Sequence, residues 1–161
     1  MKRSFLEINF DNNSELKLLI SKKSFADTSE RFSKELFKKI AIISENEYGI
    51  SFKDTYTKLL KVSTNDLIFI ENGILLISQK LEKITNNFLM LLRLSKPVYL
   101  KKEFMNKTDV IFTIFTPNNI NTPIKLQLLS KMSRILNRNN IKKQIKGVKK
   151  AEDVLALLIN V

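Results

Sequence analysis

Residues 67–78 read LIFIENGILLIS, which is two apolar runs separated by a tight-turn signal. The runs, 67–70 and 74–77, have the length and composition of strands. Between them stand Asn72 and Gly73, and the pair Asn-Gly tolerates the positive φ angles that a tight turn requires. The stretch therefore predicts two strands joined by a turn, with Ser78 at the end of the second strand.

Other strands and helices alternate on both sides of this stretch. Three further segments are short and apolar and predict strands, namely 16–20, 88–94 and 110–115. Helical spacing begins near Arg31, where Phe32, Leu36 and Phe37 start an apolar stripe after the potential caps Asp27, Thr28 and Ser29. Helical spacing returns after Pro117. A short helix is predicted to begin after a cap at Asn139 or Asn140 and to end at Gly147. Interleaved strands and helices predict an α/β sheet with helices packed on its faces.

Composition excludes several kinds of chemistry. The 161 residues contain no histidine and no cysteine, so imidazole catalysis, disulfides and thiolate metal sites are excluded. We expect no metal and no cofactor. The net charge is +12, which is typical of proteins that bind nucleic acids or membrane surfaces. However, 23 of the cations are lysine and only five are arginine, and lysine, asparagine and isoleucine are enriched together, as AT-rich codons would produce.

Neither a targeting signal nor a membrane span is expected. Glu7, Asn9 and Asp11 interrupt the apolar residues that follow the charged start of the chain. The longest apolar stretch, 67–77, is broken by Glu71 and Asn72 and falls short of the roughly 20 apolar residues of a span. These features predict a cytoplasmic protein.

Four stretches of the chain carry a family resemblance. They occur in the order NGILLIS, RLSKPVYL, DVIFTIFTP and LLSKMSRIL…IKGVKKAEDVLALL. In this order and spacing the chain resembles the IIA domain of the bacterial phosphotransferase system, in its mannitol/fructose and nitrogen-regulatory branch. The resemblance extends over residues 16–158 and is best from Pro97 onward. It implies one domain over residues 1–161, with a mixed sheet of about five strands flanked by helices on both faces; residues 1–15 show no clear period and are not assigned.

The resemblance also implies positions for the site. The phosphoacceptor motif of the family runs roughly Ile-Gly-Asn-Gly-Val-Ala-Ile-Pro-His, and here residues 70–78 take its place with Ser78 at the position of the histidine. Lys125 is nearest to the second histidine of the family, and Lys61 lies near its arginine. Asn72 and Gly73 keep the turn and are the further binding candidates.

The missing histidines have a chemical consequence. Neutral imidazole forms a phosphoramidate that can pass its phosphoryl group onward, whereas a serine hydroxyl needs a base and gives a stable ester. The resemblance therefore implies a regulatory relative that binds a protein partner without relaying phosphate through histidine. Its candidate partners are the phosphocarrier protein, a sensor kinase or a regulator of a transporter.

Several alternatives stay open. Ser78 could accept a phosphoryl group with Lys125 as its base, or Lys125 could neutralise an anion bound at the former phosphate site. The plain alternative is that Ser78 ends a strand and Lys125 is a solvated lysine at a helix start. Binding of nucleic acid through a basic surface is also open, and its lysines are 142, 143, 146, 149 and 150.

Overall fold

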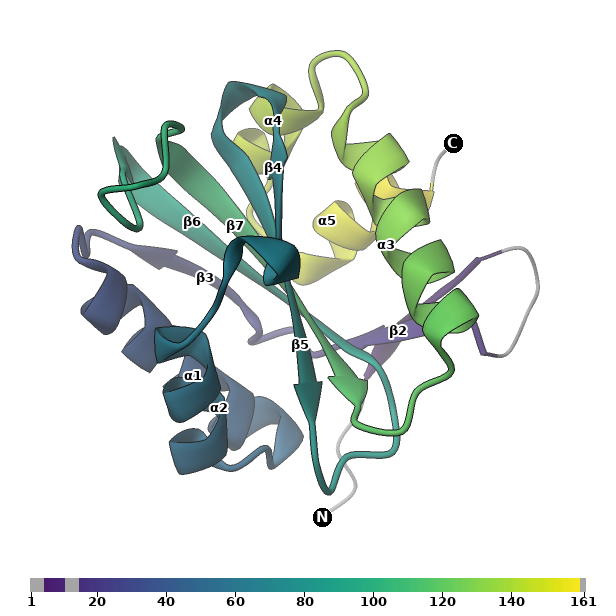
Figure 1. The fold of residues 1–161 in the computed structure, drawn as a ribbon. Helices are drawn as coiled ribbons and strands as arrows, with labels where there is room; N and C mark the ends of the chain where they lie inside the picture. Colours follow the sequence, from purple (N-terminus) through teal and green to yellow (C-terminus); the bar gives the residue numbers. More distant parts are fainter. Residues whose placement is uncertain (1–4, 11–14, 160–161) are drawn as a thin grey trace.

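The computed structural model describes residues 5–10 and 15–159 of the chain (Figure 1). The sequence-based statements about the first four residues and Asp11 lie outside these ranges. Within them the chain forms a single α/β domain with helices on both faces of a mixed sheet. This confirms the expected fold class.

The sheet contains seven strands in the described residues, so the expectation of about five is wrong. The strands are β1 (Leu6–Asn9), β2 (Lys17–Ile20), β3 (Phe25–Thr28), β4 (Leu67–Ile70), β5 (Ile74–Leu81), β6 (Phe88–Val98) and β7 (Thr108–Pro117). Their order is β1-β2-β6-β7-β5-β4, and β3 also pairs with β6. The pairs β2–β6, β3–β6 and β5–β7 are parallel, whereas β1–β2, β4–β5 and β6–β7 are antiparallel.

The two unpredicted strands, β1 and β3, are only four residues long. Neither strand contains an apolar run from which it could be predicted. Most of their side chains are half-buried or exposed, so their positions in the sheet do not require apolar residues. Asp27 and Thr28 lie in β3, opposite Arg93 and Leu94 of β6, so the idea that they cap the next helix is wrong.

Helices cover both faces of the sheet. One face carries α1 (Ser33–Tyr48) and α2 (Phe52–Leu60), and the other carries α3 (Thr122–Leu136), α4 (Ile141–Gly147) and α5 (Ala151–Ile159). Two 3-10 turns, η1 (Thr64–Asp66) and η2 (Glu71–Gly73), flank β4. Phe32 directly precedes α1 and is 72 % exposed, so its expected place on the buried stripe is wrong. It stands at the cap position, where the helical periodicity has not yet begun.

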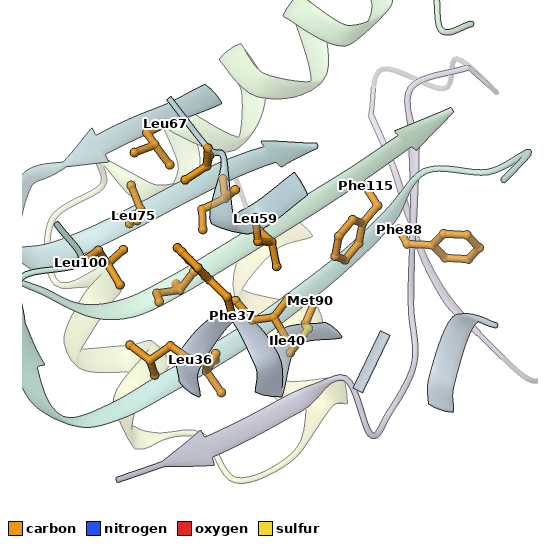
Figure 2. Packing of buried hydrophobic residues seen from close by; sticks show 14 of the residues in the cluster. Leu36, Phe37, Ile40, Leu59, Leu67, Leu75, Phe88, Met90, Leu100 and Phe115 are labelled. Atoms are coloured by element: carbon orange, nitrogen blue, oxygen red, sulfur yellow. The ribbon is translucent and has the colours of Figure 1, made fainter. Parts of the chain in front are cut away.

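Side-chain alternation along β5 divides the core into two clusters. Leu75 and Ile77 join the cluster under α1 and α2, which also contains Phe37 and Leu59 (Figure 2). Ile74 and Leu76 join the cluster under α3, α4 and α5. Since side chains of a strand alternate between faces, Ser78 and Lys80 belong to the second face. The fold thereby fixes which helix layer covers the candidate site.

Arg93 is one of the residues that attach α4 to the sheet. Arg93 of β6 donates from Nε to Oδ1 of Asp27 at 2.6 Å and from Nη2 to Oδ2 at 2.9 Å. Its guanidinium lies 4.2 Å from the centre of the Phe25 ring. The Nη1 group donates to three main-chain carbonyl oxygens at the end of α4, those of Ile145 (3.0 Å), Lys146 (3.0 Å) and Val148 (2.7 Å). These carbonyls lack partners within the helix, so the arginine satisfies acceptors that would otherwise need water.

Candidate functional site

Ser78 lies within β5 and is almost completely buried. It pairs with Ile114 of β7, on the face covered by α3. Only 5 % of the residue is exposed, and its hydroxyl oxygen makes no hydrogen bond in the described part of the chain. A buried hydroxyl without a partner costs about 1–3 kcal/mol of stability. Ser78 is therefore a destabilising group at the position that the resemblance implies for the phosphoacceptor.

Thr116 provides a second hydroxyl of the same kind. It pairs with Lys80, two residues beyond Ser78 on the same face, and is 1 % exposed. Its hydroxyl oxygen also lacks a hydrogen-bond partner among the described residues. Thr116 could not be selected from the sequence, because it follows an apolar run and the direction of its side chain depends on the register between β5 and β7.

Lys125 lies in α3, close to the charged groups that flank Ser78. Burial lowers the pKa of Lys125, repulsion from Lys80 lowers it further, and attraction by Asp66 opposes both. Lys80 is two residues after Ser78, and Asp66 directly precedes Leu67, which pairs with Ile77. Lys125 thus interacts with Lys80, the second residue after Ser78 on the same face of β5. It makes no hydrogen bond to Ser78, since the Ser78 Oγ has no partner among the described residues.

Asn72 and Gly73 lie at the opposite end of β5. At roughly 3.3 Å per residue, the five steps from Gly73 to Ser78 amount to about 16 Å. Both residues have positive φ, 67° for Asn72 and 85° for Gly73. A β-carbon on Gly73 would lie 2.9 Å from Oδ1 of Asp109 and 3.2 Å from the Lys107 carbonyl oxygen, so only glycine fits there.

A buried carboxylate holds this turn in place. Asp109 at the start of β7 is 2 % exposed and lies between Lys142 and Lys146 of α4. Oδ1 is 2.8 Å from Nζ of Lys142, and Oδ2 accepts a hydrogen bond from Lys146. Lys142 also donates to the carbonyl oxygen of Asn72. The turn and α4 are therefore tied together through one carboxylate, and sequence analysis did not identify Asp109.

Lys61 is exposed at the C-terminal end of α2, a helix of the opposite face. The structure does not bring its helix to the α3 face, where Ser78 and Lys125 lie (Figure 1). Val62, the neighbouring position, is buried at 2 % exposure, and its carbonyl oxygen accepts a hydrogen bond from Lys101 at 2.5 Å.

The chemistry available around Ser78 is limited to donors and cations. The described residues contain no group of three side chains of the types that bind metals. Ser78 and Thr116 offer hydroxyl donors, and Lys80 and Lys125 offer positive charge, a combination that suits an anion. The shielded hydroxyl of Ser78 has no base in contact, so attack on a phosphoryl group is not supported by this geometry.

Residues 17–161 match the family model described as "Phosphoenolpyruvate-dependent sugar phosphotransferase system, EIIA 2". The chain belongs to this family. The match spans every strand of the sheet except β1, all five helices, and the positions of Ser78 and Lys125. No curated protein matches the chain in sequence.

Solved structures of the family share the fold at low sequence identity. The nitrogen regulatory protein IIA-Ntr from Neisseria meningitidis is 20 % identical with a TM-score of 0.72, over 86 % of this chain and 95 % of that one. Enzyme IIA-Mtl of Escherichia coli, solved in complex with phosphorylated enzyme IIB-Mtl, is 10 % identical with a TM-score of 0.62, over 84 % and 94 %. A PTS IIA domain from Streptococcus pyogenes is 11 % identical with a TM-score of 0.62, over 83 % and 86 %. The likeness establishes an open mixed sheet with helices on both faces.

Helix length and polarity were also compared with those of membrane-spanning segments. Across residues 5–10 and 15–159, no helix combines the length and the apolar character needed to cross a bilayer.

Proposed function

We propose that this chain is a regulatory IIA-like protein that binds a protein partner and does not relay phosphate through histidine. The observation that carries the proposal is Ser78, a buried hydroxyl without a base, at the position of the phosphoacceptor. The chain has no histidine elsewhere that could replace it. The proposal places this function in the cytoplasm.

The chemistry of the hydroxyl supports the loss of relay. A phosphohistidine transfers its group readily because the phosphoramidate bond is of high energy. A phosphoserine would be a stable ester, and its formation would require both exposure and deprotonation of Ser78. Lys125 has a lowered pKa, but it shares no hydrogen bond with Ser78 and therefore does not act as its base in this geometry.

Binding to a protein is the activity that such a domain retains without histidine. The E. coli relative was solved in complex with another protein of the system, which supports a protein partner for this chain as well. The candidate partners are the phosphocarrier protein, a sensor kinase and a regulator of a transporter. The fold favours none of the three over the others.

The test combines a mass measurement with a restored histidine. Wild type, Ser78→His and Ser78→Ala are each incubated with the phosphorylated carrier protein, and their intact masses are recorded. We expect no gain of a phosphoryl group in wild type or Ser78→Ala and a gain in Ser78→His, because the docking surface is retained. A gain in wild type that disappears in Ser78→Ala would instead establish a residual acceptor at Ser78.

A binding measurement separates docking from chemistry. Titration of the labelled carrier with wild type should give an affinity similar to that with Ser78→His, since one side chain changes and the rest of the docking surface is kept. If neither chain binds the carrier, this partner is excluded and affinity capture must identify another.

The basic-surface alternative has weaker support. Two of its five lysines, Lys142 and Lys146, are engaged with Asp109. Binding to nucleic acid would fall steeply with salt, and a flat salt dependence would exclude it.

A further inference from the structure

The loop between β6 and β7, residues 99–107, presents two large apolar side chains to solvent. Tyr99 is 53 % exposed, and Met105 is 89 % exposed, the highest value among the large hydrophobic residues that the structure describes. The same loop is fixed to the domain by Leu100 and Phe104, which are both buried in the core. Its apolar residues therefore divide into two that pack inward and two that face outward, and nothing in the proposed function uses the outward pair.

Lysines surround the outward pair. Residues 96–107 contain four lysines and a single carboxylate, Glu103. One of these lysines, Lys101, is committed to the fold, because its Nζ donates to a main-chain carbonyl oxygen after α2. The Nζ of Lys107 lies 5.5 Å from the centre of the Tyr99 ring, so positive charge and apolar surface adjoin each other. The exposed lysines of this stretch are Lys96, Lys102 and Lys107.

The loop lies at the end of the sheet that is remote from Lys80 and Lys125. Along β7, eight steps of roughly 3.3 Å separate Thr108, which follows the loop, from Thr116, which pairs with Lys80, and they amount to about 26 Å. A third apolar side chain lies at the same end as the loop. Phe32, 72 % exposed, follows β3, which runs parallel to β6 (Figure 1). A body that contacts this end of the domain leaves the other end open.

The combination of protruding apolar side chains and lysines favours the surface of an anionic lipid bilayer. Lysines attract anionic headgroups without a fixed bonding geometry. Tyrosine and methionine side chains gain by leaving water for the boundary between headgroups and acyl chains. Nucleic acid would use the lysines, but Met105 offers nothing to a phosphate backbone. A protein partner would need pockets that fit Tyr99 and Met105, whereas a bilayer accepts protruding side chains of any shape.

We propose that the loop between β6 and β7 attaches this domain to membranes that contain anionic lipids. Tyr99 and Met105 enter the interfacial region, and the three exposed lysines of residues 96–107 pair with lipid phosphates. Glu103 opposes the attraction, and the lysines are screened by salt, so attachment is reversible and depends on ionic strength. The inference does not rest on the proposed function, since it involves neither Ser78 nor the carrier protein.

Co-sedimentation with lipid vesicles tests the proposal on the whole chain. One set of vesicles contains phosphatidylcholine alone, and in the other about a third of the lipid is phosphatidylglycerol. We expect binding to the anionic vesicles to be at least about tenfold tighter than to the neutral ones, and to weaken as salt is added. Equal binding to both kinds of vesicle, or binding to neither, would overturn the proposal.

A single tryptophan reports whether the loop enters the bilayer. The chain contains no tryptophan, so Met105→Trp introduces one indole whose emission has no background. With anionic vesicles this emission should shift to shorter wavelength, because the indole leaves water for the interface. Leu126→Trp is the control, since Leu126 is 59 % exposed on α3 and its emission should not change. Vesicle binding with no shift at position 105, or with equal shifts at both positions, would reject attachment through this loop.

Paired substitutions separate apolar contact from charge. Met105→Gln should weaken vesicle binding about fivefold, whereas Leu126→Gln should change it by less than about twofold. Lys102→Gln should also weaken binding about fivefold, because each lysine near an anionic surface contributes to attachment. Its control is Lys83→Gln, since Lys83 is exposed on the loop between β5 and β6, at the opposite end of the sheet. Equal weakening by Lys102→Gln and Lys83→Gln would indicate attraction by net charge without an oriented surface and would overturn the proposal.

Duplex DNA serves as the competing polyanion. We expect Met105→Gln to weaken binding to vesicles and to leave any binding to DNA unchanged, since only the bilayer accepts the apolar side chain. Tighter binding to DNA than to anionic vesicles, with no effect of Met105→Gln on either, would assign the lysines to nucleic acid and reject the membrane.

Discussion

At the start of strand β5, the turn formed by Asn72 and Gly73 is closed by a carboxylate that two lysines neutralise. Further along β5, Ser78 and the nearby Thr116 of β7 are also buried, yet their hydroxyls have no hydrogen-bond partners among the described residues. The first region neutralises its buried carboxylate, although the buried hydroxyl of Thr108 beside it also lacks a hydrogen-bond partner among the described residues. The second keeps polar groups that reduce stability, which is the usual mark of a site shaped by binding or chemistry rather than by folding.

The largest expected effect is at the closed turn. Gly73→Ala should lower the free energy of unfolding by about 3 kcal/mol, because alanine is strained at this φ and its β-carbon would clash with Asp109. Urea denaturation measures the loss. The control is Gly147→Ala, where no atom lies within 4 Å of the added carbon and the helical position predicts a small gain. Equal losses for both variants would mean that the turn is not specially constrained.

Asp109→Asn should cost about 2 kcal/mol, since the amide keeps the shape of the side chain but leaves Lys142 and Lys146 without a counter-charge. Both lysines are partly exposed, so water compensates for some of the loss. Thermal unfolding at low and high salt gives the effect. Glu103→Gln, at an exposed position, should change stability by less than about 0.5 kcal/mol. If Asp109→Asn changed stability no more than this control, the contrast between the two ends of β5 would disappear.

The opposite sign is expected around Ser78. Ser78→Ala should raise stability by about 1 kcal/mol, because it removes a buried hydroxyl without a partner. The matched control is Ser24→Ala, since Ser24 is also fully buried but its hydroxyl is 2.6 Å from the Tyr48 hydroxyl and donates to the Ser21 carbonyl oxygen at 2.8 Å. This control should lose about 1 kcal/mol. Denaturant midpoints of the two variants that shift in the same direction would contradict the assignment of Ser78 as unsatisfied.

Lys125 should give the smallest effect and the one that depends on pH. Its pKa is lower in the folded chain than in the unfolded chain, so the charged form is disfavoured in the fold. Lys125→Met should therefore stabilise the domain by a few tenths of a kcal/mol near pH 8. This gain should shrink as the pH rises towards the ordinary lysine value of 10.5, where the unfolded chain also loses the proton. Urea midpoints at several pH values test the trend.

A double-variant cycle sharpens this last prediction. In a Lys80→Met background the gain from Lys125→Met should be smaller, because one source of repulsion is already gone. An unchanged gain would mean that burial alone accounts for the lowered pKa.

Elements that are determined by their own residues could be predicted from the sequence, and elements that are determined by distant contacts could not. The turn at Asn72 and Gly73 and the ends of α4 follow from local backbone preferences, and the buried strand β7 follows from an uninterrupted apolar run. Strand β3 could not be predicted, because it is defined by pairing with β6 and by an ion pair between Asp27 and Arg93, 66 positions apart. Local patterns do not contain such partners.

The candidate site divides in the same way. The resemblance alone pointed to Ser78 and Lys125, and the structure shows that Lys125 interacts with Lys80, two residues after Ser78. Thr116 and Asp109 were missed because their importance comes from the parallel register of β5 and β7 and from the position of α4. Asn72 and Gly73 belong by geometry to the turn bound by Lys142, a role that only the three-dimensional contacts reveal.

The guanidinium of Arg93 has a kinetic consequence. Its partners lie 66 positions earlier, at Asp27, and 52 positions later, at Ile145, so these contacts form only when three distant parts of the chain have already met. We predict that these contacts form after the rate-limiting step of folding, and so break before that of unfolding, because they need three distant segments to be in place. Arg93 therefore mainly lowers the rate of unfolding. Stopped-flow measurements on Arg93→Lys should show faster unfolding with an almost unchanged folding rate.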